Sequence, residues 1–211
     1  MSVDLMIWSN HKIKWGNSPY DVISSFEELT GLKVETFHSK EKEIIGTTSD
    51  ESEAKYYSYT NRITEDFQNN NEVAIRSNYE LCSDIRILKT SCIVNPSGFF
   101  TRWTSWKKMI SKEYIKEEPI ERHSIYTELY QKWNTFHKYL KKLTKSIGSD
   151  EILYINDLSY QIPEDLFYRG EEFIKVKKEF ELIGKCVEIK GLLNQEVDHE
   201  LGQIWFNEKV N

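Results

Sequence analysis

The most regular hydrophobic pattern in the chain runs from Pro119 to Ile147, where apolar residues recur at spacings of three and four. At 100° per residue these positions share one face of a helix; they are Ile125, Leu129, Trp133, Phe136, Leu140, Leu143 and Ile147. The opposite face carries lysines, which are Lys138, Lys141, Lys142 and Lys145. Pro119 suits a first helical turn, and Gly148 can adopt the left-handed conformation that ends a helix. The pattern predicts one long helix at the core of the protein.

Aromatic side chains with polar tips lie beside the apolar face of this predicted helix. They are Tyr126, Tyr130 and His137. One interpretation is that they line the margin of the core, where a ring packs while its polar tip stays in water. The other is a binding face that also includes Trp133, because Tyr and Trp are enriched among the residues that anchor protein interfaces. The sequence leaves both interpretations open.

Two further helices are predicted from their start and stop signals. Ser18 and Pro19 provide the cap and first turn of one helix, and Gly31 ends it. Its apolar face comprises Val22, Ile23, Phe26 and Leu29. The second helix covers residues 165–183 and is broken or bent near Gly170, and its inner face comprises Phe173, Val176, Phe180 and Ile183.

A period of two marks most of the predicted strands. The strands cover residues 4–8, 32–37, 73–79, 85–89, 91–94, 99–106, 152–155 and 203–207. Residues 95–98 (NPSG) form a strong turn sequence, so we predict a hairpin between 91–94 and 99–106. By contrast, the small, polar and acidic segment 46–53 predicts a mobile loop.

The order of these elements predicts an α+β fold. The first strand, helix and strand would form the opening unit of one layer, and the elements between residues 99 and 183 would wrap one face of the sheet. The strand at 203–207 would lie at an edge. We expect a single globular α+β domain over residues 1–211, with a mixed, largely antiparallel sheet packed against the long central helix and two or three further helices.

Composition and charge narrow the class of protein. Of the 211 residues, 39% are hydrophobic and 13% aromatic, as expected for a packed globule. The formal net charge of −6 disfavours a nucleic-acid partner, since such binders usually carry a basic excess. No segment has the length of a membrane helix and no signal peptide is evident, so we expect a cytoplasmic protein without a membrane partner. Three cysteines at no metal-like spacing indicate reduced thiols: Cys82, Cys92 and Cys186.

Two groups of residues are candidate sites. Arg102, Trp103 and Trp106 lie on the predicted return strand, where a cation beside an indole could hold a sugar, a nucleotide base or a partner's side chain. These residues could equally pack in the core. Asp157 and Tyr160 follow a predicted strand, and ligands of α/β sheets bind at the carboxyl ends of strands. Asp157 could equally form a turn or cap a helix.

Metal and cofactor signals are weaker. Asp198, His199 and Glu200 resemble metal ligands in composition, but three adjacent residues do not converge on one ion in an ordinary loop. The chain contains no HExxH, P-loop, GxSxG or GxGxxG sequence. We therefore expect no metal ion and no cofactor.

Together these observations favour a non-catalytic interaction protein that binds or inhibits a protein partner, as a toxin-neutralising immunity protein does. The acidic charge favours a basic partner, which electrostatic steering would bring in quickly. One alternative is an enzyme, a hydrolase or transferase with Arg102, Asp157, Tyr160 and a histidine in one pocket. The other is a small-ligand sensor with a pocket but no general base. A cleft that gathers those residues would favour the enzyme.

Overall fold

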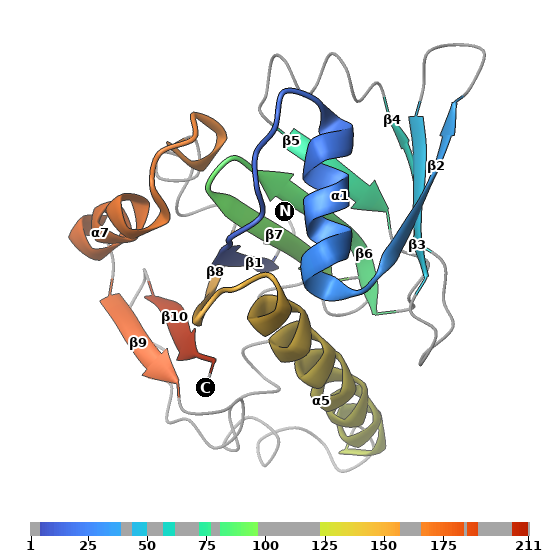
Figure 1. Cartoon of the computed structure of the whole chain (residues 1–211). Coiled ribbons are helices and arrows are strands. Elements are labelled where there is room, and N and C mark those ends of the chain that lie inside the picture. The colour runs from blue at the N-terminus through green and yellow to red at the C-terminus, as the bar shows by residue number, and fades with distance from the viewer. Residues whose placement is uncertain are drawn as a thin grey trace.

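The computed structural model describes residues 5–38, 44–49, 57–61, 72–76, 81–96, 123–156, 166–183, 185–189 and 204–210. Seven of its strands form one sheet in the order β5-β6-β7-β1-β8-β10-β9 (Figure 1). They are β1 Leu5–Asn10, β5 Glu72–Arg76, β6 Cys82–Leu88, β7 Ser91–Pro96, β8 Glu151–Asn156, β9 Lys185–Ile189 and β10 Ile204–Lys209. Neighbouring strands are antiparallel except β9 and β10, which are parallel. The predicted α+β class, with its mixed and largely antiparallel sheet, is confirmed.

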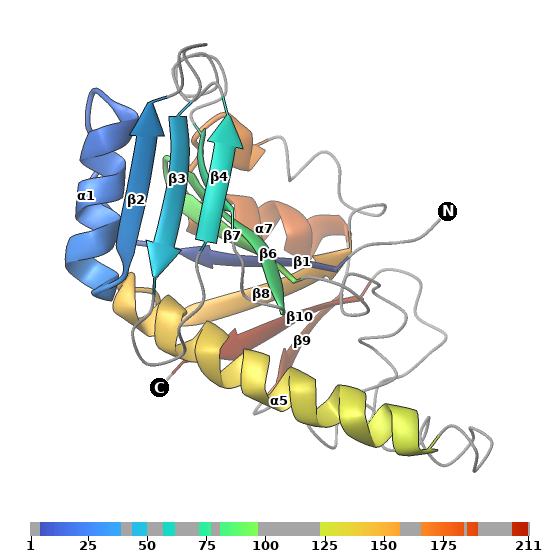
Figure 2. The same ribbon diagram turned by 90° about the vertical axis from the view of Figure 1, so that its right-hand side faces the viewer.

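A second, smaller sheet lies against the first. Its three antiparallel strands are β2 Lys33–His38, β3 Ile44–Ser49 and β4 Tyr57–Asn61. Figure 2 shows these strands beside helix α1 and crossing the direction of the larger sheet. The contact with the larger sheet is made at its edge strand β5.

Helices cover both faces of the seven-stranded sheet. Helices α1 Pro19–Thr30 and α5 His123–Ser146 lie on one face, and α7 Phe173–Ile183 lies on the other (Figure 1). The period of two explains this division, because successive residues of a strand point to opposite faces. In β8, Tyr154 joins the core under α5 while Leu153 joins the core under α7. Two hydrophobic cores therefore share one sheet.

Helix α5 buries the face that its hydrophobic spacing predicts. The buried side chains, none of them more than 4% exposed, are Trp133, Phe136, Leu140, Leu143 and Ile147. Of the predicted solvent-facing lysines, Lys138, Lys142 and Lys145 are exposed, whereas Lys141 is half-buried. Gly148 follows the helix with φ 80°, as predicted. Pro119 lies outside the described residues, as do the side chains of Ile125 and Leu129.

Helix α1 begins and ends where its signals predict. The Ser18 hydroxyl accepts a hydrogen bond from the Asp21 N–H at 3.3 Å, and the Asp21 carboxylate accepts one from the Ser18 N–H at 3.0 Å. Gly31 ends the helix with φ 72°. Phe26 is fully buried, but Leu29, predicted on the same face, is 37% exposed.

The predicted helical segment over 165–183 is broken near Gly170, because residues 169–172 are not helical. A short helical turn covers residues 166–168, and Gly170 follows it with φ 77°. Helix α7 then begins at Phe173 and buries the predicted inner side chains Phe173, Val176 and Phe180.

The mobile loop predicted at 46–53 is wrong for residues 46–49, which belong to β3. Strand β3 pairs with β2 on one edge and with β4 on the other, so its backbone groups find partners on both sides. Gly46, for example, lies opposite both Thr36 and Tyr59. The small polar residues of this segment suggested a loop because local composition does not reveal the strands that pair with it. Residues 50–53 lie outside the described part of the chain.

The predicted hairpin between 91–94 and 99–106 is wrong at its first strand. Strand β7 pairs with β6, where Ile85 lies opposite Val94, and with β1, where Ile7 lies opposite the same residue. Both edges of residues 91–94 are thus occupied, which leaves no place for a return strand. The observed hairpin joins β6 to β7. Residues 99–106 are not among those described.

Three predictions of arrangement are also wrong. The first strand, helix and strand do not form a unit of one layer, because β1 and β2 belong to different sheets. Helices α5 and α7 do not wrap one face, because they pack on opposite faces. Strand β10, predicted at an edge, lies between β8 and β9. The strand at this edge of the sheet is β9, which the sequence pattern did not reveal.

Candidate functional site

Many of the predicted site residues lie outside the part of the chain that the structure describes. These are Arg102, Trp103, Trp106, Asp157, Tyr160, Asp198, His199 and Glu200. Tyr126 and Tyr130 belong to α5, but their side chains are not described. Trp133 and His137 are described and are both buried, at 1% and 8% exposed. These two side chains therefore belong to the core and its margin rather than to an open surface.

His137 belongs to a buried cluster that joins α5 to the sheet. Strand β10 places Glu208 two residues after Phe206, on the face that packs against α5. His137 Nε2 lies 2.7 Å from Glu208 Oε2, and the Tyr154 hydroxyl donates to the same oxygen at 2.8 Å. Lys141 Nζ lies 3.2 Å from Glu208 Oε1. We name these four residues, His137, Lys141, Tyr154 and Glu208, the Glu208 cluster.

Glu208 is only 1% exposed, yet its partners favour the ionised form. Burial raises the pKa of Glu208, but the hydrogen bond and charge of His137, the Tyr154 hydroxyl and the charge of Lys141 together lower this pKa below its ordinary value of 4.5. The pKa of Tyr154 is raised well above its ordinary value, because burial and the Glu208 charge both disfavour a phenolate. The cluster thus holds a carboxylate that accepts and a phenol that donates.

The geometry of the Glu208 cluster indicates that it stabilises the fold rather than takes part in catalysis. A catalytic acid or base must reach a substrate, whereas the Glu208 carboxylate is enclosed by its partners on α5 and β8. The sequence reasoning named His137 but missed Glu208 and Tyr154. The available signal was the period of two, which places Glu208 on the same inward face as Phe206 and so predicts a buried acid.

A second buried carboxylate lies on the opposite face of the sheet. Glu151, 6% exposed, accepts from Lys177 Nζ at 2.6 Å and from Lys209 Nζ at 2.9 Å. Burial raises the pKa of Glu151, but the two ammonium groups outweigh that effect and lower the pKa below its ordinary value. Since Lys177 belongs to α7, this pairing attaches α7 to strand β8.

His11 plays a similar connecting role after β1. Its Nε2 donates to the Leu88 carbonyl at 2.8 Å, and its Nδ1 accepts from the Ile13 N–H at 3.1 Å. Burial lowers the pKa of His11 and outweighs these hydrogen bonds, so the neutral ring is favoured. The ring ties the segment before α1 to the end of β6.

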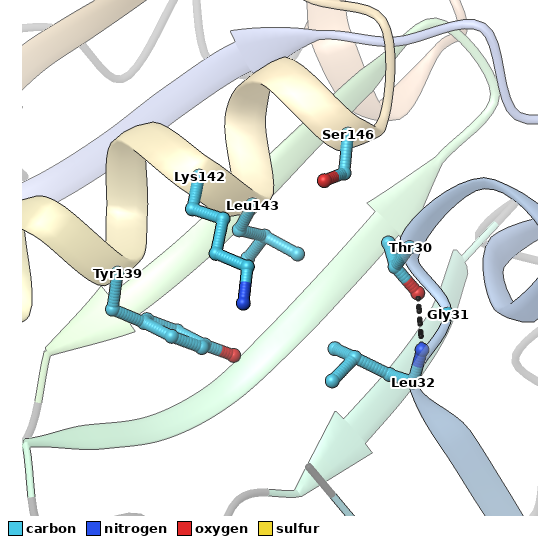
Figure 3. Close-up of a pocket in the computed structure, with 7 residues that line it drawn as sticks. All are labelled: Thr30, Gly31, Leu32, Tyr139, Lys142, Leu143 and Ser146. Atoms are coloured by element: carbon cyan, nitrogen blue, oxygen red, sulfur yellow. Dashed lines mark hydrogen bonds between the residues drawn. The ribbon is translucent and has the colours of Figure 1, made fainter. Parts of the chain in front are cut away.

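A shallow hollow lies where the end of α1 meets the last turns of α5 (Figure 3). Its volume is about 70 Å³, and its lining residues are Thr30, Gly31, Leu32, Tyr139, Lys142, Leu143 and Ser146. We name it the α1–α5 groove. Pockets for drug-sized ligands and cofactors measure roughly 300–1,000 Å³. The groove therefore matches a single side chain better than a nucleotide or a sugar.

Two large aliphatic side chains are exposed on the outer face of α7. Ile174 is 63% exposed and Leu182 is 78% exposed, although the inner face of the same helix is buried. Eight residues of helix separate them by about 12 Å along the axis and about 80° around it. We name these two residues the α7 patch.

Comparisons with protein-family models, with curated proteins and with solved structures find no match to this chain. In the described part of the chain, no three His, Cys, Asp or Glu side chains are grouped so that they could hold a metal ion. Among the same residues, no helix combines the length and apolar character needed to span a membrane. A functional proposal has to rest on geometry and charge.

Proposed function

We propose that this chain is a non-catalytic interaction protein that binds or inhibits a protein partner, in the manner of an immunity protein. The observation that carries this proposal is the α7 patch, in which Ile174 and Leu182 present most of their apolar surface to water. Covering one such side chain contributes about 1.5–3 kcal/mol. A partner that covers both would gain a substantial part of its binding free energy there.

The α7 patch is well placed for this role because α7 is fixed to the sheet. Phe180 and Val176 are fully buried beneath it, and Lys177 pairs with the buried Glu151. A helix held in this way loses little conformational freedom when a partner binds. The helix therefore holds these two aliphatic side chains in fixed positions, with the exposed Lys178 halfway between them.

The distribution of charge supports a basic partner. The described residues hold 17 of the 28 Lys and Arg and 15 of the 34 Asp and Glu, which leaves 11 basic and 19 acidic residues in the remaining segments. The acidic excess of the chain thus belongs to those segments. We expect them to steer a basic partner toward the molecule, with the α7 patch supplying apolar contact.

The test is recovery of a stoichiometric partner from a native lysate on the tagged full chain. We expect Ile174→Ser together with Leu182→Ser to lower the recovered partner by about tenfold or more, because roughly 1.4 kcal/mol corresponds to a factor of ten. The matched control is Tyr20→Ser together with Leu29→Ser, which removes two apolar side chains from α1, each 37% exposed. Circular dichroism would show that both double variants keep the wild-type fold.

Two results would refute the proposal. One is that the tagged wild-type chain recovers no stoichiometric partner. The other is that both double variants lose the partner equally, since the α7 patch would then have no specific role.

A further inference from the structure

Exposed lysines gather around the α1–α5 groove. Lys142 lines the groove, Lys138 and Lys145 are exposed on the same helix, and Lys33 is exposed next to the lining residue Leu32. The aliphatic chain of Lys12 lies against Gly148 at the end of α5. This face is therefore basic, although the whole chain has a formal charge of −6.

Only part of this positive charge is balanced locally. Helices α1 and α5 both end at this face, and each helix C-terminus contributes about half a negative charge. The carboxylates at the same ends are that of Glu27, which accepts from the Val34 N–H, and those of the exposed Glu28 and Asp150. Five lysines against three carboxylates and the two helix ends leave an excess of about one positive charge. That excess favours an acidic ligand.

Inside the groove, one ammonium group lies beside an apolar wall. Figure 3 shows Tyr139 and Lys142 extending from α5 toward Thr30 and Leu32 at the end of α1. Leu32 and Leu143 are 7% and 4% exposed, so they form an apolar floor. The Thr30 hydroxyl accepts from the Leu32 N–H at 3.2 Å and holds the turn at the end of α1 in place. The lining therefore offers an ammonium group for an acidic side chain and an apolar floor for an aliphatic one.

We propose that the α1–α5 groove binds an acidic segment of a protein, with an aliphatic side chain against Leu32 and Leu143 and a carboxylate at the Lys142 ammonium. A hollow of about 70 Å³ is matched to one such side chain. A nucleic acid fits less well, because the ring of Tyr139 is only 8% exposed and offers little face for a base to stack on. The groove lies on the face of the sheet opposite to the α7 patch, so this site does not depend on the proposed function.

The test titrates the ¹⁵N-labelled full chain with a synthetic acidic peptide, acetyl-DELDE-amide, and with its neutral counterpart, acetyl-NQLNQ-amide. We expect saturable shifts at the backbone amides of Gly31, Leu32 and Leu143 with the acidic peptide, and at least fivefold weaker binding of the neutral one. The affinity should also fall as salt screens the lysines. Lys142→Gln should weaken acidic-peptide binding about threefold to tenfold, whereas Lys178→Gln, an exposed lysine of α7, should leave it unchanged.

Several results would overturn this proposal. One is the absence of saturable shifts at the groove amides, and another is equal binding of the two peptides. Equal effects of the two lysine variants would also overturn it. Inorganic phosphate or a single-stranded oligonucleotide that shifts the same amides at lower concentration than the peptide would assign the face to simple anions or to nucleic acid. All four outcomes are measured at the groove, and they do not depend on whether a partner is recovered through the α7 patch.

Discussion

Glu208 is the residue whose charge most directly links α5 to the sheet. Glu208→Gln keeps the shape of the side chain but removes the negative charge that His137, Tyr154 and Lys141 surround. Breaking a buried charged cluster on one side is costly, so we expect the free energy of unfolding at pH 7 to fall by about 2–4 kcal/mol. Urea unfolding would measure this change. Glu181→Gln, at an exposed position of α7, is the control and should change stability little.

The pKa of Glu208 also predicts how the difference in unfolding free energy between wild type and Glu208→Gln depends on pH. The folded-state pKa lies below the ordinary value of 4.5, so ionised Glu208 stabilises the folded state above about that pH. The stabilisation is lost as the pH falls through the lower folded-state value. The difference between wild type and Glu208→Gln should therefore shrink as the pH is lowered below 4.5. A difference that stays constant down to pH 3 would show that the charge is not responsible.

Cys92 offers a separate test at the scale of one residue. Its side chain is fully buried, and burial raises the pKa of its thiol to about 12. At pH 8 the thiol is both protonated and shielded, so iodoacetamide should leave Cys92 unmodified in the folded chain and alkylate it in urea. Peptide mass spectrometry would measure the extent of Cys92 alkylation in both states. Modification of Cys92 in native buffer at the rate seen in urea would contradict the buried placement.

At the scale of elements, the ends of the two helices that meet at the groove can be compared directly. Gly31 and Gly148 have φ 72° and 80°, so alanine at either position adopts a disfavoured left-handed conformation at a cost of about 1 kcal/mol. Only at Gly148 would the added Cβ also meet the Lys12 side chain, whose Cδ lies 2.8 Å away, while nothing lies within 4 Å at Gly31. We expect Gly31→Ala to lower the unfolding free energy by about 1 kcal/mol and Gly148→Ala by about 2 kcal/mol. Equal losses of unfolding free energy, measured by thermal or urea unfolding, would mean that the Lys12 side chain moves aside without an energetic cost.

The sequence predicted helices better than sheets, for a physical reason that particular elements show. Helix α1 follows from Ser18, Asp21 and Gly31, each of which acts on backbone groups within four residues of itself. The conformation of β3 depends instead on β2 and β4, and the place of β10 depends on β8 and β9. Strand pairs join residues far apart in sequence, and a local period of two records the face of a residue but not its neighbour.

The same limit applies to the candidate sites. His137 was recognisable as part of an aromatic margin, but its partner Glu208 lies 71 residues away. Residue type alone does not give exposure, since Trp133 is 1% exposed while Leu182 is 78% exposed. Large aromatic residues attract attention as interface anchors, yet the positions that actually face solvent follow from which side of each helix meets the sheet.

At the scale of the whole molecule, two opposite surfaces carry different chemistry. The α7 patch is aliphatic, and the α1–α5 groove is basic with an apolar floor. The sheet between them makes both surfaces parts of one framework, because successive residues of its strands face different cores. Tyr154 and Leu153 are adjacent in β8, yet they belong to the cores under α5 and α7 respectively.

This shared sheet predicts that the two cores unfold together. Phe136 of α5 and Phe180 of α7 are both fully buried, and alanine at either position should lower the unfolding free energy by about 3–5 kcal/mol. Trp8 lies in the core under α7 and Trp133 in the core under α5, so fluorine NMR of fluorotryptophan-labelled chain reports on each core separately. In both variants we expect the two signals to lose native intensity at the same lowered urea concentration, because neither set of inward side chains stays packed once β8 separates. Leu182→Ala should leave both midpoints nearly unchanged. If Phe180→Ala moved only the Trp8 signal, the cores would be independent, and a partner on the α7 patch could not influence the α1–α5 groove through the sheet.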